Sequence, residues 1–227
     1  FHRLISPSIG MTTEMIHAGA IIHGDRDRFL RFDESEQPLA LQLGGSDPAD
    51  LAKASAIAAP YGYDEINLNC GCPSERVQKG SFGACLMREP SVVSDCVKAM
   101  NDAVHGAIPI TIKCRIGVDD SDEDQFLTDF VGHVAEAGCP LFIIHARKAW
   151  LKGLSPKENR EVPPLNYERV YRLKQQFPHV KILINGGFDT SDKIADALPH
   201  TDGVMIGREA YQNPCFLYEL EQRFYGG

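Results

Sequence analysis

Short apolar stretches that alternate with helical or irregular segments constrain the fold of this chain more than any other feature. Seven of them have the length and composition of buried strands, at residues 9–15, 39–45, 65–73, 109–117, 141–147, 181–187 and 203–208. No hairpin turn joins one to the next, so each strand must return through a crossover. The pattern therefore predicts a parallel sheet, either doubly wound or closed into a (β/α)8 barrel.

The segments between these strands read mostly as helices. Capping residues, proline at the first turn and helical spacing predict helices near residues 48–59, 90–104, 125–137, 167–177 and 216–224, and the start of one more helix at residues 190–192. Residues 23–38 are charged and end at a proline, and they are predicted to be a loop. The glycine-containing segment after residue 73 is also expected to be a loop.

Polar residues and glycine at the ends of successive strands favour the barrel over the doubly wound sheet. They are Gln42, Asn67, Asn69, Lys113, Arg115, His145, Arg147, Asn185 and Gly207. Their apolar neighbours have the opposite parity and would face outward. A ring of polar groups at the carboxyl ends of the strands is typical of a barrel with one ligand, because a doubly wound sheet gathers such groups at its switch point.

Composition narrows the class of protein further. The chain has 227 residues, a net charge of -8 and 7 cysteines without a C-x-x-C pair, so neither a zinc site nor a disulfide framework is expected. No apolar run is long enough to span a membrane. We expect a monomeric cytoplasmic protein without a metal. The chain begins at Phe1, within an apparent helix and without an initiator Met, so N-terminal sequence is expected to be missing.

The motif Asn69-Cys-Gly-Cys-Pro places an amide and a thiol at one strand tip. Cys72 would be held rigidly between glycine and proline, and an ordinary thiol is mostly protonated at neutral pH, so it can donate a proton. Cys85 is the rival reactive thiol, although its apolar neighbours indicate burial. Asn67 and Asn69 could instead bond to neighbouring strands or to buried water.

Strand ends later in the chain offer an anion site. Glycine turns after the last two strands of a barrel often bind phosphate, which here points to Asn185, Gly186, Gly187, Gly207 and Arg208. Lys113, in an apolar strand, would form a Schiff base, stabilise negative charge on a carbonyl or flavin, or pair structurally with Glu14. His145 would line the site or remain a core histidine.

A basic segment follows the fifth of these strands. Against one acid, Glu158, it carries Arg147, Lys148, Lys152, Lys157 and Arg160 around the single tryptophan, Trp150. In a chain of net negative charge, this reversal predicts contact with a polyanion, the alternative being an ordinary solvated loop.

Several of these motifs together resemble the tRNA-dihydrouridine synthases. Asn69-Cys-Gly-Cys-Pro-Ser, Ile112-Lys-Cys-Arg-Ile-Gly, Ile144-His-Ala-Arg, Ile184-Asn-Gly-Gly and Ile206-Gly-Arg-Glu are similar to that family's motifs and come in the same order. The runs Ala146-Arg-Lys-Ala-Trp, Leu154-Ser-Pro-Lys-Glu-Asn-Arg and Arg208-Glu-Ala-Tyr-Gln-Asn-Pro resemble its A-type branch, which acts on uridines 20 and 20a of the tRNA D-loop.

The resemblance implies a flavoenzyme in which NADPH reduces FMN and the reduced flavin reduces the C5–C6 bond of uridine. It implies FMN contacts from Gln42, Lys113, His145, Asn185, Gly186, Gly187, Gly207 and Arg208. Cys72 would be the general acid, and tRNA would be contacted by Asn69, Arg115, Lys157 and Arg160.

Two departures and two rival functions accompany this resemblance. Residues 1–227 would form an incomplete flavin-binding TIM barrel, lacking the family's first strand, of Ala-Pro-Met type, and its C-terminal helical tRNA-binding domain. One rival is another enzyme on the same barrel, such as a flavin reductase of free pyrimidines or a Schiff-base lyase. The other is a non-catalytic RNA-binding barrel.

Overall fold

The structure, a computed structural model, describes residues 1–121 and 123–226. All of the strand pairs in its single sheet are parallel, in the order β1-β3-β4-β5-β6-β7-β8, with β2 also beside β3. The strands are β1 (Met11–Thr12), β2 (Ile16–His17), β3 (Leu39–Gly44), β4 (Glu65–Cys70), β5 (Ile110–Arg115), β6 (Leu141–His145), β7 (Lys181–Asn185) and β8 (Gly203–Met205). Every predicted strand region is confirmed.

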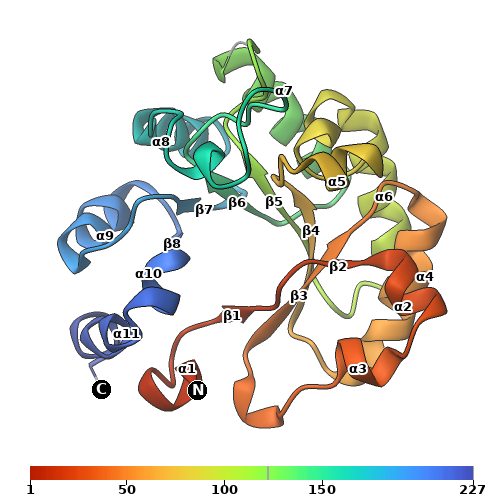
Figure 1. The fold of residues 1–227 in the computed structure, drawn as a ribbon, viewed down its shortest axis with the longest axis horizontal. Coiled ribbons are helices and arrows are strands. Elements are labelled where there is room, and N and C mark those ends of the chain that lie inside the picture. Colours follow the sequence, from red (N-terminus) through yellow and green to blue (C-terminus); the bar gives the residue numbers. More distant parts are fainter. Residues whose placement is uncertain (122, 227) are drawn as a thin grey trace.

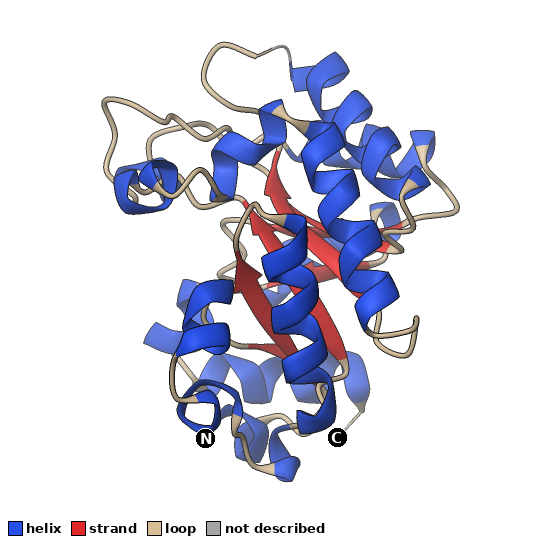
Figure 2. Ribbon diagram, turned by 90° about the vertical axis from the view of Figure 1, so that its right-hand side faces the viewer, coloured by secondary structure: helices blue, strands red, loops and turns tan. Residues whose placement is uncertain are grey.

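The sheet curls into most of a barrel with helices on its outer side (Figures 1 and 2). The helices are α1 (His2–Ile5), α2 (Ala18–His23), α3 (Arg26–Leu30), α4 (Pro48–Ala58), α5 (Glu75–Lys79), α6 (Pro90–Ala103), α7 (Glu123–Glu136), α8 (Tyr167–Gln176), α9 (Ser191–Ala197), α10 (Arg208–Gln212) and α11 (Cys215–Leu220). The strands follow one another across the sheet in sequence order, without the reversal of a doubly wound sheet, which confirms the predicted (β/α)8 type of fold, here as a partial barrel.

An open seam separates the first and last strands. The described sheet runs from β1 to β8 without a pairing that would close the ring. The two chain ends lie near each other beside this seam (Figures 1 and 2). They are tied together by Glu221, whose carboxylate accepts hydrogen bonds of 2.5 Å from the hydroxyls of Ser6 and Ser8. Hydrogen bonds therefore link the two ends of the chain beside the seam.

The parity predicted from the sequence explains where the core lies. Alternate strand residues such as Leu41, Leu68 and Ile144 are fully buried beneath the helices, whereas Asn67 and Asn69 share the other parity and face the barrel interior. Side-chain caps fix the helices against this sheet, as where Asp47 accepts a hydrogen bond from the Asp50 amide at the start of α4.

The structure differs from the prediction in two ways: short helices lie where loops were predicted, and one predicted strand is interrupted. Asp25 caps α3, a capping box between Asp33 and Glu36 starts a 3₁₀ turn, and Ser74 caps α5. The predicted strand at residues 9–15 is interrupted between β1 and β2, because the hydroxyl of Thr13 accepts the hydrogen bond of the Gln42 amide in place of a backbone carbonyl. Local capping by Asp25, Asp33 and Ser74 therefore explains the short helices.

Within the described residues, no helix combines the length and the apolar character that a membrane span requires.

Candidate active site

A cavity of about 490 Å³ opens at the carboxyl ends of the strands. Most of the predicted site residues line it, namely Asn69, Cys72, Lys113, Arg115, His145, Arg160, Asn185, Gly186, Gly187, Gly207 and Arg208. They come from five successive strands, β4 to β8, and from the loops that follow them. The parallel sheet therefore brings together residues that lie far apart in the sequence.

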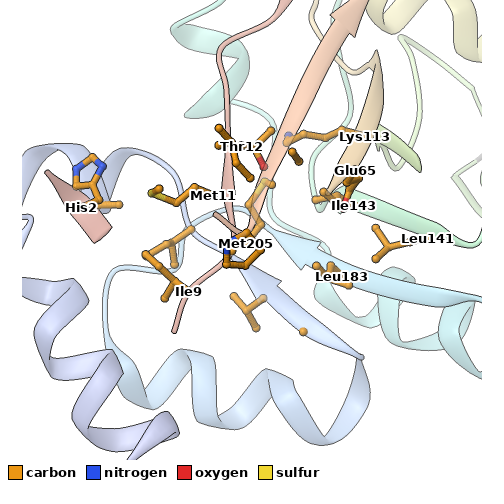
Figure 3. Close-up of a pocket in the computed structure, with 18 of the residues that line it drawn as sticks. His2, Ile9, Met11, Thr12, Glu65, Lys113, Leu141, Ile143, Leu183 and Met205 are labelled. Atoms are coloured by element: carbon orange, nitrogen blue, oxygen red, sulfur yellow. The ribbon is translucent and has the colours of Figure 1, made fainter. Parts of the chain in front are cut away.

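A second cavity, of about 830 Å³, occupies the open seam between β1 and β8. Met11 and Thr12 line it from one side, and Met205 lines it from the other (Figure 3). Asn69 and Lys113 line both cavities, so the two spaces meet at these side chains. Gln42 lines the seam cavity alone, which separates it from the other predicted cofactor contacts.

The loop that carries Cys72 is held in one conformation. The side-chain oxygen of Asn69 accepts hydrogen bonds from the amides of Gly71 and Cys72, at 3.1 and 3.0 Å. The carbonyl of Cys72 accepts from the Ala84 amide, and a side chain at Gly83 would approach that carbonyl oxygen to 2.5 Å. The half-buried Cys72 thiol is thus fixed at the cavity, with its Sγ 3.5 Å from the hydroxyl of Ser74.

The other cysteines are less suited to react there. Cys85 is half-buried, its Sγ donates to the carbonyl of Phe82 at 3.0 Å, and it lines neither cavity. Cys70 and Cys114 are fully buried, and burial raises the pKa of each thiol. Cys72 is the only cysteine among the residues that line the two cavities.

Lys113 is a half-buried cation at the junction of the cavities. Its ammonium donates to the side-chain oxygen of Asn185 at 3.3 Å. Burial, and then the neighbouring Arg115, lower the pKa of Lys113 to about 8. The same two influences act on His145, where burial and the charges of Arg115 and Lys113 lower the pKa to about 2, so that this imidazole is neutral. An anion in the cavity would offset the cost of these buried charges.

The pH dependence of stability tests the burial of Lys113. Between pH 8 and 10.5 the unfolded chain holds a proton on Lys113 that the folded protein has released, so in this window the unfolding free energy of the flavin-free wild type should rise with pH relative to that of Lys113→Met. This difference should total about 3 kcal/mol, whereas the buried thiols titrate alike in both proteins and cancel in the comparison. Urea denaturation at several pH values measures it, and equal slopes for both proteins would show that Lys113 is hydrated.

The glycine turn after β7 fits closely against its neighbours. Gly186 has a φ of +119°, and a Cβ atom there would lie 2.8 Å from the His145 ring. Beside it, the hydroxyl of Tyr167 donates to the carbonyl of Gly186 at 2.5 Å. At Gly207, in contrast, a Cβ atom would meet nothing within 4 Å, and this residue lines the cavity. The two predicted phosphate turns therefore border the same space.

Arg115 has a different set of partners from the one expected of a tRNA contact. The side chain is buried, and it donates to backbone carbonyls from its Nε to Gly71 at 3.1 Å and from its Nη1 to Lys148 and Asn159 at 3.1 and 2.8 Å. It lines the cavity as well. Arg115 thus joins the Cys72 loop to the basic segment.

A second side chain, missed by sequence reasoning, makes the same connection. The amide nitrogen of Gln78 donates to the carbonyl of Pro73 at 2.7 Å and to that of Leu151 at 2.8 Å. Only the position of Gln78 four residues after a helix cap, Ser74, hinted that it would face inward. The Cys72 loop and the basic segment are therefore joined at two places, by Arg115 and by Gln78.

The basic segment itself is ordered around Asn159, which is fully buried. Its side chain accepts from the Trp150 amide at 2.7 Å and donates to the Trp150 carbonyl at 2.9 Å. Lys157 and Arg160 are exposed on this segment, and only Arg160 lines the strand-end cavity. Arg208 forms an ion pair of 2.7 Å with Glu161, so this predicted phosphate ligand already has a carboxylate partner.

No group of three or more His, Cys, Asp or Glu side chains is placed to hold a metal ion among the described residues. The cavity is lined by one thiol, by the side-chain amides of Asn69, Asn185 and Gln212, by two carboxylates and by several cations. Together with a partial parallel barrel whose strand ends carry these groups, this arrangement defines a β/α-barrel enzyme.

Comparison with known protein families identifies the group of barrel enzymes to which this chain belongs. The family model for dihydrouridine synthases matches residues 1–226. The chain belongs to the dihydrouridine synthase family of oxidoreductases.

Curated relatives extend this match over the whole chain. A protein of Xanthomonas campestris is 58% identical over 226 residues, one of Vibrio parahaemolyticus 59% over 227, and one of Escherichia coli 57% over 227. Each is named tRNA-dihydrouridine(20/20a) synthase. The alignments cover 100% of this chain but 67%, 69% and 68% of those proteins, so the chain spans about two thirds of its relatives' length.

A solved structure supports the fold alone. A 2-naphthoyl-CoA reductase complex superposes with a TM-score of 0.61 at 11% identity, covering 76% of this chain and 28% of that one.

Proposed function

We propose that this chain is the catalytic barrel of an enzyme that uses FMN and NADPH to reduce uridine to 5,6-dihydrouridine at positions 20 and 20a of the tRNA D-loop. One observation carries the proposal: the only cysteine lining the cavities, Cys72, shares a cavity with half-buried Lys113, neutral His145 and two glycine turns. The family membership and the names of the relatives support the reaction and the target positions.

The donor set of the cavity fits FMN. In this proposal Lys113 lies at the flavin ring, where its positive charge stabilises the anion of the reduced form, and His145 contacts the cofactor as a neutral donor. Asn185, Gly186, Gly187, Gly207 and Arg208 hold the phosphate end. Gln42 reaches the cofactor from the seam side.

The reaction adds a hydride and a proton across the C5–C6 double bond of uracil. FMN, once reduced by NADPH, supplies the hydride to C6. The Cys72 thiol gives its proton to C5, and the thiolate that remains regains a proton from solvent. Asn69 is placed to orient the base: its side-chain nitrogen donates one hydrogen to Gln42 at 2.8 Å, and we assign the other to a uracil carbonyl.

Access to a uridine in folded tRNA requires the base to leave its stack, which costs a few kcal/mol. Lys157 and Arg160 lie on the segment bordering the cavity and would bind phosphates near the flipped nucleotide. We further propose that Arg115 acts on tRNA binding through the carbonyls it holds in this segment. The enzyme would act as a monomer in the cytoplasm, where tRNA is found.

The direct test is NADPH-dependent formation of dihydrouridine on unmodified tRNA by the FMN-loaded enzyme, with positions 20 and 20a read by mass spectrometry. Free uracil serves as the competing substrate. Product from tRNA alone is expected. Product from free uracil alone would favour a pyrimidine reductase, and a protein that cannot be loaded with FMN would contradict the flavin mechanism.

Charge reversal on the basic segment tests the tRNA contact. The double variant Lys157→Glu/Arg160→Glu should weaken tRNA binding. It should also make the negative slope of log K, where K is the tRNA association constant, against log salt concentration less steep by about 1 to 2. Filter binding at several salt concentrations measures this. Lys193→Glu, on α9 and ion-paired with Asp189 at 2.6 Å, is the matched control. An unchanged slope in the double variant would make the segment an ordinary solvated surface.

A further inference from the structure

A continuous chain of side-chain hydrogen bonds runs through the barrel interior below the Cys72 loop. The amides of Gly71 and Cys72 donate to Asn69, and Asn69 donates to Gln42 at 2.8 Å. Gln42 donates to Asn67 at 3.0 Å, and Asn67 donates to the hydroxyl of Thr111 at 2.8 Å. Thr111 donates to the carboxylate of Glu65, which ends the chain.

The sheet register places these groups in line. Gln42 lies opposite Asn67 on the neighbouring strand, and Asn67 lies opposite Thr111 on the next one. Gln42, Asn67, Asn69 and Thr111 are buried, so each hydrogen bond lost here leaves a polar group without compensation. Glu65, the first residue of β4, lies at the seam cavity (Figure 3).

Every donor in this chain points in one direction, from the Cys72 loop toward Glu65. An ionised carboxylate only accepts hydrogen bonds, so Glu65 requires the hydroxyl of Thr111 to donate downward. Thr111 must then accept from Asn67, and the same orientation passes to Gln42 and Asn69. At present the side-chain oxygen of Asn69 accepts from the backbone N–H groups of Gly71 and Cys72. If the amides were reversed, the side-chain nitrogen of Asn69 would face these two donors instead.

Burial raises the pKa of Glu65, and hydrogen bonds from Thr111 and Asn67 oppose this rise, so the donors of the chain help to hold the carboxylate ionised.

We propose that Glu65, Thr111 and Asn67 are positioning residues for the proton donor. They fix the amide orientation of Asn69 and thereby the backbone of the loop that holds Cys72, although none of the three lines the strand-end cavity. The kinetic part of this inference rests on the proposed function; the structural part does not. It assigns Asn67 a role as a link in the chain.

Thr111→Val is the most informative variant, because it removes the hydroxyl with little change in shape. Thr111→Ser keeps the hydroxyl and should restore the chain. Thr128→Val is the matched control, since the Thr128 hydroxyl bonds Arg169 and Gln176 on the outer face of the molecule. Hydrogen exchange at the Gly71 and Cys72 amides is measured on the protein with and without FMN, and kcat and KM for tRNA are measured on the FMN-loaded enzyme.

For Thr111→Val, exchange at the two amides should quicken about tenfold and kcat should fall about tenfold, with KM within about twofold of wild type. Thr111→Ser and Thr128→Val should match wild type in both quantities. Unchanged exchange in Thr111→Val, or equal losses in Thr111→Ser, would overturn the proposal. A wild-type enzyme without activity would defeat the proposed function alone, since the exchange comparison would still decide the positioning role.

Discussion

Replacing Cys72 with alanine should lower the rate of dihydrouridine formation about 10²- to 10⁴-fold, the range that a general acid contributes. The Cys72 Sγ lies 3.5 Å from the hydroxyl of Ser74, a weak contact, so removing the thiol should disturb little else. The loop backbone is held independently by Asn69 and Ala84. FMN content and tRNA affinity should therefore stay within about twofold of wild type.

The measurement is single-turnover reduction of tRNA by the pre-reduced enzyme, which isolates the proton-transfer step from flavin reduction. Cys85→Ala is the matched control, because that thiol bonds a backbone carbonyl outside both cavities. Wild-type rates in Cys72→Ala, or an equal loss in Cys85→Ala, would remove Cys72 from the acid role.

Replacing Arg115 with methionine should lower the free energy of unfolding by about 3 kcal/mol, because three backbone carbonyls, that of Asn159 buried and those of Gly71 and Lys148 partly buried, lose a charged donor. Burial lowers the pKa of Arg115 to about 10, which shows how far the charge is removed from water. The link between the Cys72 loop and the basic segment would then rest on Gln78. Turnover and tRNA affinity should therefore fall together.

Urea denaturation gives the stability change, and limited proteolysis within residues 147–161 reports whether the segment has loosened. Arg115→Lys serves as the conservative comparison: it keeps the charge but cannot reach three carbonyls with a planar fork, so its losses should be intermediate. A methionine variant with wild-type stability and protease resistance would show that the carbonyls are satisfied without Arg115.

Strand positions could be predicted from the sequence because buried parallel strands are nearly continuous apolar runs. The stretches at residues 39–45, 141–147 and 181–187 needed no knowledge of their neighbours. The failures lay among residues 9–38 and at residues 75–79, where helices of a few residues depend on single caps such as Asp25 and Ser74 rather than on periodicity. A polar stretch without an apolar period reads as a loop whether or not it is capped.

The site could be predicted to the extent that strand ends meet at one edge of a parallel sheet. That rule brought Asn69, Lys113 and His145 around one cavity. It could not show that the fork of Arg115 binds three carbonyls, or that Gln78 bridges two loops, because all of those partners except Pro73 lie 33 to 73 residues away. Thr111 was invisible for a related reason: a threonine in a strand is ordinary until its neighbour across the sheet is known.

The hydrogen bonds of Arg115 and Gln78 that join the Cys72 loop to residues 147–161 limit how substrate preference can change. If residues 147–161 contact tRNA as proposed, this segment cannot be exchanged as an independent module, because Arg115 and Gln78 bond it to the backbone carbonyls of Gly71 and Pro73 on either side of Cys72. Grafting a segment of different RNA preference onto this barrel would have to preserve the carbonyl positions of Lys148, Leu151 and Asn159. Variation in target choice is therefore constrained by the geometry of catalysis.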